Sequence, residues 1–245
     1  MAVHPLLSID DVSMQFGGVR ALDGVTFSVQ PGEIVGLIGP NGAGKSTLFN
    51  VISGVARPTG GEVHFSGTRI DGRSPDIICR RGVARTFQSA SLLAGMTCWE
   101  NVHVASLFCR DDETPADRRT ADALELCGLA DRADAPVEAI TTGEAKRLEI
   151  ARAIATQPRL LMTDEAVAGL NPAETDQIVG ILRKLNAAGV TIMFVEHDMR
   201  AVMSLVQRIV VLAQGRLLAE GSPQDIAQSP IVIEAYLGTR YAQRR

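Results

Sequence analysis

The chain has 245 residues, of which 46% are hydrophobic and 21% are charged, and its net charge at pH 7 is −4. This is the profile of a soluble globular protein with enough chain to bury a large core. Nucleic acid surfaces are usually basic, so the mild acidity argues against nucleic acid as a partner.

The N-terminal residues lack the long apolar run of a signal peptide. No window reaches the roughly 18 apolar residues of a membrane-spanning helix. If the protein works at a membrane, we expect another chain to do the spanning. The four cysteines form no C-x-x-C pair and no zinc-like spacing with histidine. We therefore expect reduced, packed thiols at Cys79, Cys98, Cys109 and Cys127.

The first part of the chain predicts strands and one helix. Residues 25–30 alternate as a strand, and residues 61–65 are a second candidate. Residues 33–39 (EIVGLIG) form a short apolar run ended by glycine, which is typical of a buried strand. A helix is predicted to follow over about residues 45–53.

The middle of the chain, residues 99–156, is helical and charged in pattern and contains no buried strand. We expect a helical lobe inserted into an α/β lobe. Within it, the stretch ITTGEAKRLEIARA predicts a helix whose start is marked by Thr141 and Glu144, which are spaced as a capping box.

Buried strands and a helix alternate again in the last third. Residues 160–162 lead into Asp164, residues 191–195 lead into Glu196, and a helix over about residues 173–187 separates them. This alternation predicts a doubly wound parallel sheet. After Arg208 the pattern returns to a strand, and short helices are predicted to begin near Pro223 and Pro230.

The sequence GPNGAGKST follows one predicted strand and opens a helix, and it fits the phosphate-loop pattern G-x-x-x-x-G-K-S/T. Its glycines let successive N–H groups turn inward around a phosphate. Lys45 is expected to reach the β- and γ-phosphates, and Ser46 to hold Mg²⁺. The alternative is an ordinary glycine-rich turn. The residues expected to hold the phosphates are Gly39, Pro40, Asn41, Gly42, Ala43, Gly44, Lys45, Ser46 and Thr47.

A phosphate loop also needs a carboxylate for Mg²⁺ at the end of a neighbouring strand. The stretch LLMTDE supplies Asp164, expected to bind Mg²⁺ through water, and Glu165, expected to polarise the attacking water. The alternative is a strand that ends in two surface acids. Thr163 is unusual inside an apolar strand, and we expect it to pack there and to hydrogen-bond locally.

Five features occur in a fixed order along the chain: Phe16, Gln88, Gly143, the acidic pair after residue 163, and His197. This order and spacing resembles the ATP-binding cassette (ABC) transporter ATPases over nearly the whole chain. The segments FGGVRALDGVTFSV, RTFQ, RLEIARA, AGLNP, EHDM and IEAYLG are most similar to the branch that serves branched-chain amino acid importers.

The resemblance implies an α/β fold: a P-loop, RecA-like core with a parallel sheet, an antiparallel β subdomain and an inserted helical subdomain. A single ABC ATPase domain would span residues 1–245. Its catalytic α/β lobe would take up about residues 1–90 and 157–220, its helical lobe about residues 91–156, and short C-terminal helices about residues 221–245.

The resemblance also implies roles for single residues. Phe16 would stack on adenine, although it could instead be an ordinary strand-core aromatic. Gln88 would contact Mg²⁺ and water and would sense the membrane partner. His197 would hydrogen-bond the γ-phosphate. Asn171 would lie at a dimer interface, or would merely cap the next helix.

In this family a signature of the type L-S-G-G-Q starts a helix that closes over the γ-phosphate bound by the other subunit. Thr141 keeps the hydroxyl of that signature, and Gly143 and Glu144 also fit it. Thr142 replaces a residue that is often glycine, and Ala166 stands where the family usually has the proline of D-E-P.

The resemblance implies ATP and Mg²⁺ as cofactors and a second ABC ATPase subunit, in a homodimer or a heterodimer. Further partners would be transmembrane permease subunits and, indirectly, a periplasmic solute-binding protein. The chain would lie peripherally on the cytoplasmic face of a bacterial inner membrane. Residues 88–99 would receive a helix of the permease, and Trp99 would either anchor that contact or fill the core of the helical lobe.

Lys45, Glu165 and His197 of one chain would form each catalytic site together with the signature helix of the other chain. The resulting function is ATP hydrolysis that powers an importer of branched-chain amino acids or related small solutes. One alternative is a regulatory partner with weak hydrolysis in an asymmetric heterodimer. Another is a soluble ABC ATPase acting on DNA or ribosomes, but the long insertions or tandem cassettes usual in that class are not found here.

Overall fold

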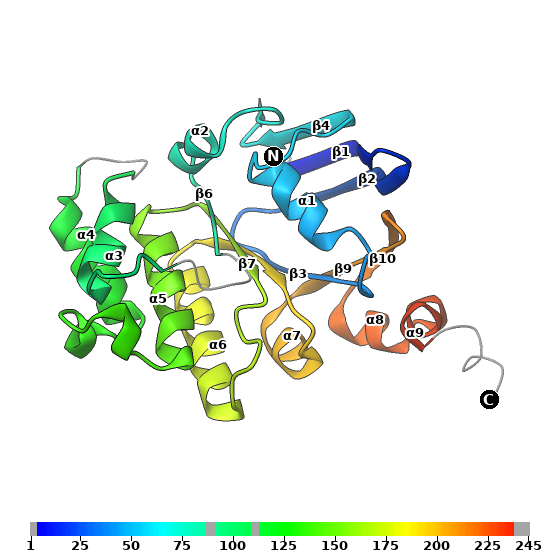
Figure 1. Ribbon diagram of the computed structural model, residues 1–245. Helices are drawn as coiled ribbons and strands as arrows, with labels where there is room; N and C mark the ends of the chain where they lie inside the picture. Colours follow the sequence, from blue (N-terminus) through cyan, green and yellow to red (C-terminus); the bar gives the residue numbers. More distant parts are fainter. Residues whose placement is uncertain (1–3, 87–91, 109–112, 238–245) are drawn as a thin grey trace.

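The computed structural model describes residues 4–86, 92–108 and 113–237. A sheet of six strands, in the order β10-β9-β3-β8-β7-β6, runs through its centre (Figure 1). Five of these strands are parallel, and β10 pairs antiparallel with β9. The strands are β3 (Ile34–Ile38), β6 (Val83–Arg85), β7 (Leu160–Asp164), β8 (Thr191–Val195), β9 (Arg208–Ala213) and β10 (Arg216–Gly221).

Strands β3, β7 and β8 are buried at every position, as their continuous apolar runs predict for a parallel sheet covered on both faces. Successive residues face opposite layers. Leu161 and Phe194, for example, pack on the side of the helical lobe, whereas Met162 and Met193 pack towards the antiparallel sheet and α1 (Lys45–Ile52). The predicted doubly wound parallel sheet is confirmed.

A second, antiparallel sheet has the strand order β2-β1-β4-β5. Its strands are β1 (Leu7–Phe16), β2 (Val19–Val29), β4 (Gly60–Phe65) and β5 (Thr68–Arg69). The strands predicted at residues 25–30 and 61–65 belong to it, but β1 escaped prediction. The register of β1 shifts between Ile9 and Val12, and Asp11 has a φ of 52°, so a bulge interrupts the apolar alternation.

The remaining helices of the α/β part are α2 (Pro75–Arg80), α6 (Pro172–Ala187), α7 (Met199–Leu205), α8 (Pro223–Gln228) and α9 (Pro230–Leu237). The helices predicted over residues 45–53 and 173–187 match α1 and α6, and α8 and α9 begin at the predicted prolines. The prediction missed α2, α7, β6 and β10 because they are only three to seven residues long and show too little periodicity.

Three helices pack together at one end of the molecule: α3 (Cys98–Ser106), α4 (Ala116–Leu126) and α5 (Thr142–Ala155) (Figure 1). Two short 3-10 turns, Ala130–Arg132 and Val137–Ala139, connect α4 to α5. The described part of residues 99–156 is helical and contains no strand, as predicted. Trp99 is half-buried, packs against this core and stacks on His103 with ring centroids 6.3 Å apart, which agrees with its role in the helical core.

Cys98 and Cys127 are buried and Cys79 is half-buried, and none of the three forms a disulfide, as expected. Cys109 lies outside the described residues. Among the helices that the structure describes, none has the length and apolar character needed to cross a membrane.

Thr163 lies in β7 with no solvent exposure, as its shape predicts. The expected local hydrogen bond is wrong, because its Oγ1 atom has no hydrogen-bond partner in the described part of the chain. A buried polar atom without a partner lowers stability.

We predict that Thr163→Val stabilises the protein by about 1 kcal/mol, because valine keeps the shape and removes the unpaired hydroxyl. Urea unfolding followed by circular dichroism measures the change. Thr191→Val is the matched control: Thr191 Oγ1 accepts a hydrogen bond from the N–H of Gly32 at 2.8 Å, so its loss should cost about 1–3 kcal/mol. Equal destabilisation by both variants would contradict this account.

Candidate functional site

The loop between β3 and α1 is held by main-chain packing that only glycine permits. Gly39 and Gly44 have positive φ angles of 153° and 103°. A Cβ atom at Gly39 would lie 2.1 Å from the carbonyl oxygen of Leu212, and one at Gly44 would lie 2.6 Å from that of Ala21. The loop therefore rests directly on the backbones of β9 and β2, and its N–H groups have a fixed orientation.

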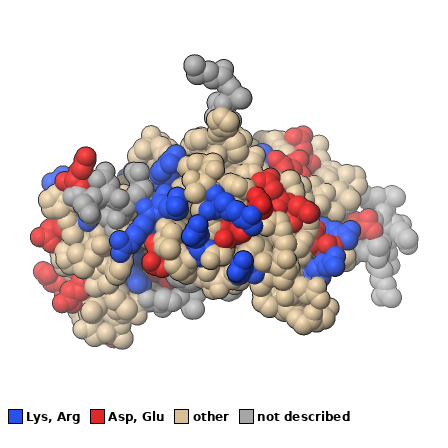
Figure 2. Space-filling view, turned by 90° about the horizontal axis from the view of Figure 1, so that it is seen from above, with Lys and Arg blue, Asp and Glu red and all other residues tan. Residues whose placement is uncertain are grey.

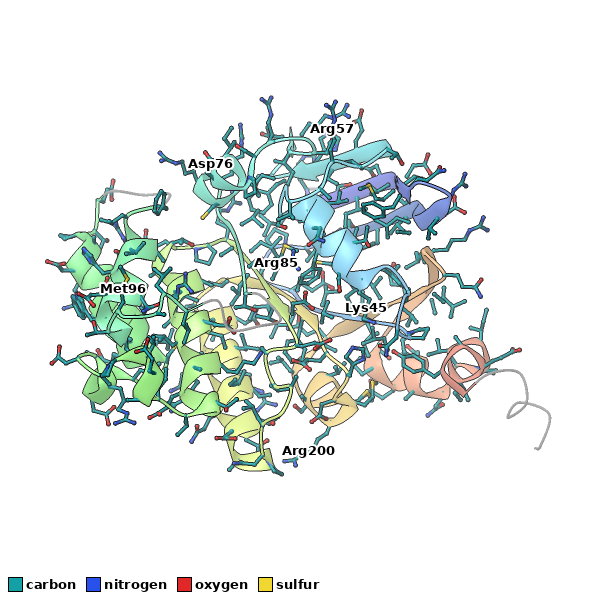
Figure 3. All side chains as sticks on the ribbon, in the orientation of Figure 1. Lys45, Arg57, Asp76, Arg85, Met96 and Arg200 are labelled. Carbon is teal, nitrogen blue, oxygen red and sulfur yellow. The ribbon has the colours of Figure 1, made fainter. Side chains whose placement is uncertain are left out.

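Lys45 is the first residue of α1, and its side chain folds back over the loop (Figure 3). Its Nζ atom donates to the carbonyl oxygens of Gly39 at 2.7 Å and Pro40 at 3.2 Å. Burial lowers the pKa of Lys45, and the negative charges of Glu165 and Asp164 partly offset that effect. The ammonium group thus lies inside the loop and close to two carboxylates.

A cavity of about 730 Å³ opens above the loop. The ends of β7 and β8 contribute Asp164, Glu165 and His197 to its wall, and the start of β2 contributes Val19, Arg20 and Ala21. From the loop and α1 the cavity is lined by Asn41, Gly42, Ala43, Gly44, Lys45, Ser46 and Thr47. The structure therefore brings most of the predicted phosphate and metal residues into one cavity.

Glu165 and His197 are in direct contact in the wall of this cavity, with 3.3 Å between Glu165 Oε1 and His197 Nε2. Glu165 has a positive φ of 54°, which is unusual for a residue with a side chain. Its N–H donates to the carbonyl oxygen of Val195 at 2.9 Å, and its own carbonyl oxygen accepts from Lys146 Nζ at 3.2 Å. The backbone is held on both sides, and the residue lines the cavity beside His197.

Two residues with side-chain oxygens of the kind that bind hard cations, Asp164 and Ser46, belong to the same wall. Asp164 Oδ2 accepts a hydrogen bond from Arg85 at 3.0 Å, whereas Asp164 Oδ1 and Ser46 Oγ bond to no described residue. No cluster of three or more potential metal ligands occurs in the described ranges. This donor set fits Mg²⁺, which is usually bound by one or two protein oxygens together with phosphate oxygens and water. Gln88, the other predicted metal contact, lies outside the described residues.

Phe16 lies at the end of β1, and 54% of it is exposed. The alternative of a strand-core aromatic is therefore wrong. Phe16 does not line the cavity itself, but it pairs with Val19, which does. The sequence reasoning missed Val19, Arg20 and Ala21. The hairpin turn GG after Phe16 was the available signal, since it folds these residues back beside the loop.

The predicted capping box at the start of α5 is confirmed. Thr141 is the N-cap, Glu144 N–H donates to its hydroxyl at 3.2 Å, and Thr141 N–H donates to the Glu144 carboxylate at 2.8 Å. Arg132 and the Thr141 N–H lower the pKa of Glu144 to about 2. Thr141 and Thr142 are exposed, and no residue of α5 is among those that line the cavity. The start of α5 therefore lies outside the wall of the cavity around the phosphate loop of the same chain.

Gly143 marks a close approach of α5 to α6, because a Cβ atom there would lie 2.6 Å from Glu174 Oε1. Asn171 is the N-cap of α6 and forms a capping box with Glu174. The interpretation of Asn171 as a helix cap is confirmed, and the residue is exposed.

Glu196 lies directly behind the site and is 2% exposed. Burial raises its pKa to about 7, and nearby Glu165 acts in the same direction. The N–H of Val167 donates to its carboxylate at 2.8 Å, and the charge of Lys146 partly opposes the rise. Sequence reasoning did not single out this residue, because an acid after a buried strand looks the same whether it is exposed or covered.

The raised pKa of Glu196 predicts a pH-dependent contribution to stability. Its folded pKa of about 7 exceeds the ordinary value of 4.5, so the contribution is complete below pH 4.5 and is lost as pH rises through 7. The full loss is on the order of 3 kcal/mol. We predict that Glu196→Gln, which keeps the Val167 contact, flattens the fall in unfolding free energy between pH 5 and 8.

Urea unfolding at several pH values measures this difference. The control is Glu125→Gln, because Glu125 is exposed on α4, and its curve should run parallel to that of the wild type. If the unfolding free energy of Glu196→Gln changes with pH in the same way as that of the wild type, Glu196 is not the group that retains its proton in the folded protein.

A family model described as "ABC transporter" matches residues 22–168, and another described as "Branched-chain amino acid ATP-binding cassette transporter" matches residues 216–242. The high-affinity branched-chain amino acid transport ATP-binding proteins BraF of Pseudomonas aeruginosa and LivG of Escherichia coli are 42% and 43% identical to the chain. Each alignment covers 96% of this chain and 98% of the relative.

Solved structures of ATP-binding cassettes have the same fold. The ADP conformation of a cassette of an ABC transporter superimposes with a TM-score of 0.88 and 30% identity, over 96% of this chain and 99% of the other. A dimeric cassette in a post-hydrolysis state, bound to ADP and Pi, gives a TM-score of 0.79 and 26% identity, over 89% and 98% of the two chains. The chain belongs to the ABC transporter family, as one of its ATP-binding cassettes with an ATPase fold.

Proposed function

We propose that the chain is the ATP-hydrolysing subunit of an importer for branched-chain amino acids or related small solutes. The observation that carries the proposal is one cavity that joins the phosphate loop to Asp164, Glu165 and His197. The importer class is supported by the likeness to BraF and LivG, which extends over nearly the whole chain. The match of residues 216–242 to the branched-chain family model supports the same class.

The loop N–H groups and Lys45 would bind the β- and γ-phosphates of ATP. Lys45 already lies against the loop carbonyls, so a phosphate would draw its ammonium group outward by a short side-chain movement. Phe16 would stack on adenine beyond the edge formed by Val19. Ser46 and Asp164 would hold Mg²⁺, which neutralises phosphate charge when it is bound.

Glu165 would orient and polarise the water that attacks the γ-phosphate in line. Its fixed backbone keeps the carboxylate directed into the cavity. His197 lies 3.3 Å from this carboxylate and would hydrogen-bond the γ-phosphate. Gln88 would contribute a contact to Mg²⁺ and to the water.

A second chain would complete each site, because the signature start does not reach its own loop. The exposed N-terminus of α5, with the Thr141 hydroxyl, would cover the γ-phosphate bound by the partner chain. Gly143, Glu144 and Asn171 would lie at this interface. The dimeric cassette with ADP and Pi supports a dimer of this kind, which could be a homodimer or a heterodimer.

A groove of about 250 Å³ between α2, β6, α3 and α5 is a candidate site for a permease helix. Exposed apolar side chains occur on the segments around it, at Val55, Ile77, Leu107 and Phe108. Figure 2 shows Lys and Arg side chains gathered on the face that carries α2 and β4 in Figure 1. The exposed arginines of residues 57–81, the segment that contains β4 and α2, are Arg57, Arg69, Arg73, Arg80 and Arg81. A permease segment with acidic residues would complement this face.

We further propose that the catalytic lobe (about residues 1–90 and 157–220) and the helical lobe (about residues 91–156) move relative to each other when ATP closes the dimer. The segment from Gln88 to Trp99 would transmit this movement to the permease. The subunit would lie on the cytoplasmic face of a bacterial inner membrane. A periplasmic solute-binding protein would act on it only through the permease.

The regulatory alternative is favoured by one feature, the exposed Thr142 at the α5 N-terminus. Its side chain adds bulk where the helix would approach the partner's phosphate. A chain of this kind would bind ATP but would leave most turnover to a different ATPase subunit. Robust ATP hydrolysis by the pure, isolated chain would exclude this alternative, whereas hydrolysis that appears only with a second ATPase subunit would support it.

For the catalytic role of Glu165, we predict that Glu165→Gln lowers kcat of the assembled transporter by about 100-fold or more, because an amide cannot polarise the water. ATP binding should persist, since the phosphate contacts are unchanged. A phosphate-release assay and equilibrium nucleotide binding measure the two effects separately. Glu125→Gln, on the exposed face of α4, is the control. Unchanged turnover in the Glu165 variant would remove Glu165 from this role.

A further inference from the structure

Arg85 is the last residue of β6 and lies between α1 and the end of β7 (Figure 3). Its side chain is 9% exposed, and the surface it keeps belongs to the wall of the groove beside α2. It is one of the few arginines of the described chain that are this deeply covered. A guanidinium group in such a place needs a charged or strongly polar partner.

The two ends of the guanidinium group join two elements of the nucleotide site. One nitrogen, Nη1, donates to Asn50 Oδ1 at 2.6 Å and to Ser53 Oγ at 3.3 Å, both at the C-terminal end of α1. The other, Nη2, donates to Asp164 Oδ2 at 3.0 Å. The flat face lies 5.4 Å from the centre of the Phe49 ring. Only arginine has a rigid fork that can satisfy both sides at once.

Asp164 is 3% exposed, so its carboxylate has little water to stabilise its charge. Arg85 is the only residue in the described ranges that forms an ion pair with it. Removing one partner of such a buried ion pair strongly destabilises the folded protein, because the other charge stays buried without a counter-charge. The pair uses Oδ2 and leaves Oδ1 without a hydrogen-bond partner among the described residues, and Asp164 lines the cavity that also contains Ser46.

We propose that Arg85 is the resident counter-ion of Asp164 and sets how tightly the site binds a divalent cation. The guanidinium group neutralises Asp164 while the site holds no metal and orients Oδ1 towards the cavity. When a cation binds, the positive charge of Arg85 on the far side of the carboxylate opposes it. The pair therefore keeps the site ordered without a metal and weakens the metal-bound state, which favours release after hydrolysis. This inference rests on the proposed role of Asp164 as the metal carboxylate.

The test is a titration of the full chain with Mn²⁺ at saturating ADP, with protein-bound Mn²⁺ measured by electron paramagnetic resonance and the same ADP concentration without protein as the blank. Removing the charge in Arg85→Gln should lower the dissociation constant of Mn²⁺ about tenfold or more. Arg85→Lys keeps the charge, and its affinity should stay within about threefold of the wild type. An unchanged or weaker affinity in Arg85→Gln would overturn the proposal.

Asn50→Asp is a second variant that keeps Arg85 in place and does not depend on the folding of Arg85→Gln. A carboxylate at this position would share the guanidinium charge with Asp164, so Mn²⁺ should again bind several-fold tighter. No change in a folded Asn50→Asp variant would also count against the proposal.

Asp164→Asn separates this inference from the function on which it rests. If Mn²⁺ affinity does not fall in Asp164→Asn, Asp164 is not the metal carboxylate, and both the metal assignment and the role of Arg85 fail. If affinity falls in Asp164→Asn but stays unchanged in Arg85→Gln and Asn50→Asp, the metal assignment stands and only the counter-ion role is rejected.

Discussion

Main-chain packing at Gly39 and Gly44 holds the phosphate loop between the two sheets, and every other part of the site is placed relative to that loop. The contacts are to carbonyl oxygens of β9 and β2, so neither position can accept a side chain without moving a strand. Two further backbone hydrogen bonds, Gly215 N–H to Ala43 and Asp23 N–H to Gly215, tie the β9–β10 turn to the loop and to β2. The antiparallel sheet thereby helps to shape a site whose chemistry lies on the parallel sheet.

The charges of the site are arranged around this fixed backbone in opposing pairs. Lys45 is buried beside Asp164 and Glu165, Arg85 neutralises Asp164 from behind, and Lys146 contacts the carbonyl oxygen of Glu165. The exception is Glu196, whose burial raises its pKa to about 7. Ser46, Glu165 and His197 line the cavity where a triphosphate would lie.

Local chemistry made much of the fold and the site predictable. The apolar run at residues 191–195 predicted β8 with the correct bounds, and the spacing of Thr141 and Glu144 predicted the correct N-cap of α5. Contacts between distant segments were not predictable in this way. Arg85 and Asp164 are 79 residues apart, and nothing in their spacing indicates an ion pair. The bulge at Asp11 interrupts the alternation that would have predicted β1. Whether Thr163 finds a hydrogen-bond partner depends on which distant residues pack around it, which its neighbours in the sequence do not show.

The central claim is that the backbone amides of the phosphate loop, together with Lys45, bind the phosphates of an adenine nucleotide. Its most direct test is equilibrium titration of the pure chain with a fluorescent ATP analogue, displaced by unlabelled ATP, in parallel with Lys45→Ala. The account predicts saturable, displaceable binding by the wild type and at least a tenfold weaker affinity in the variant, because one charge-assisted contact to phosphate is lost. Absence of saturable binding, or equal affinity in the two proteins, would contradict it.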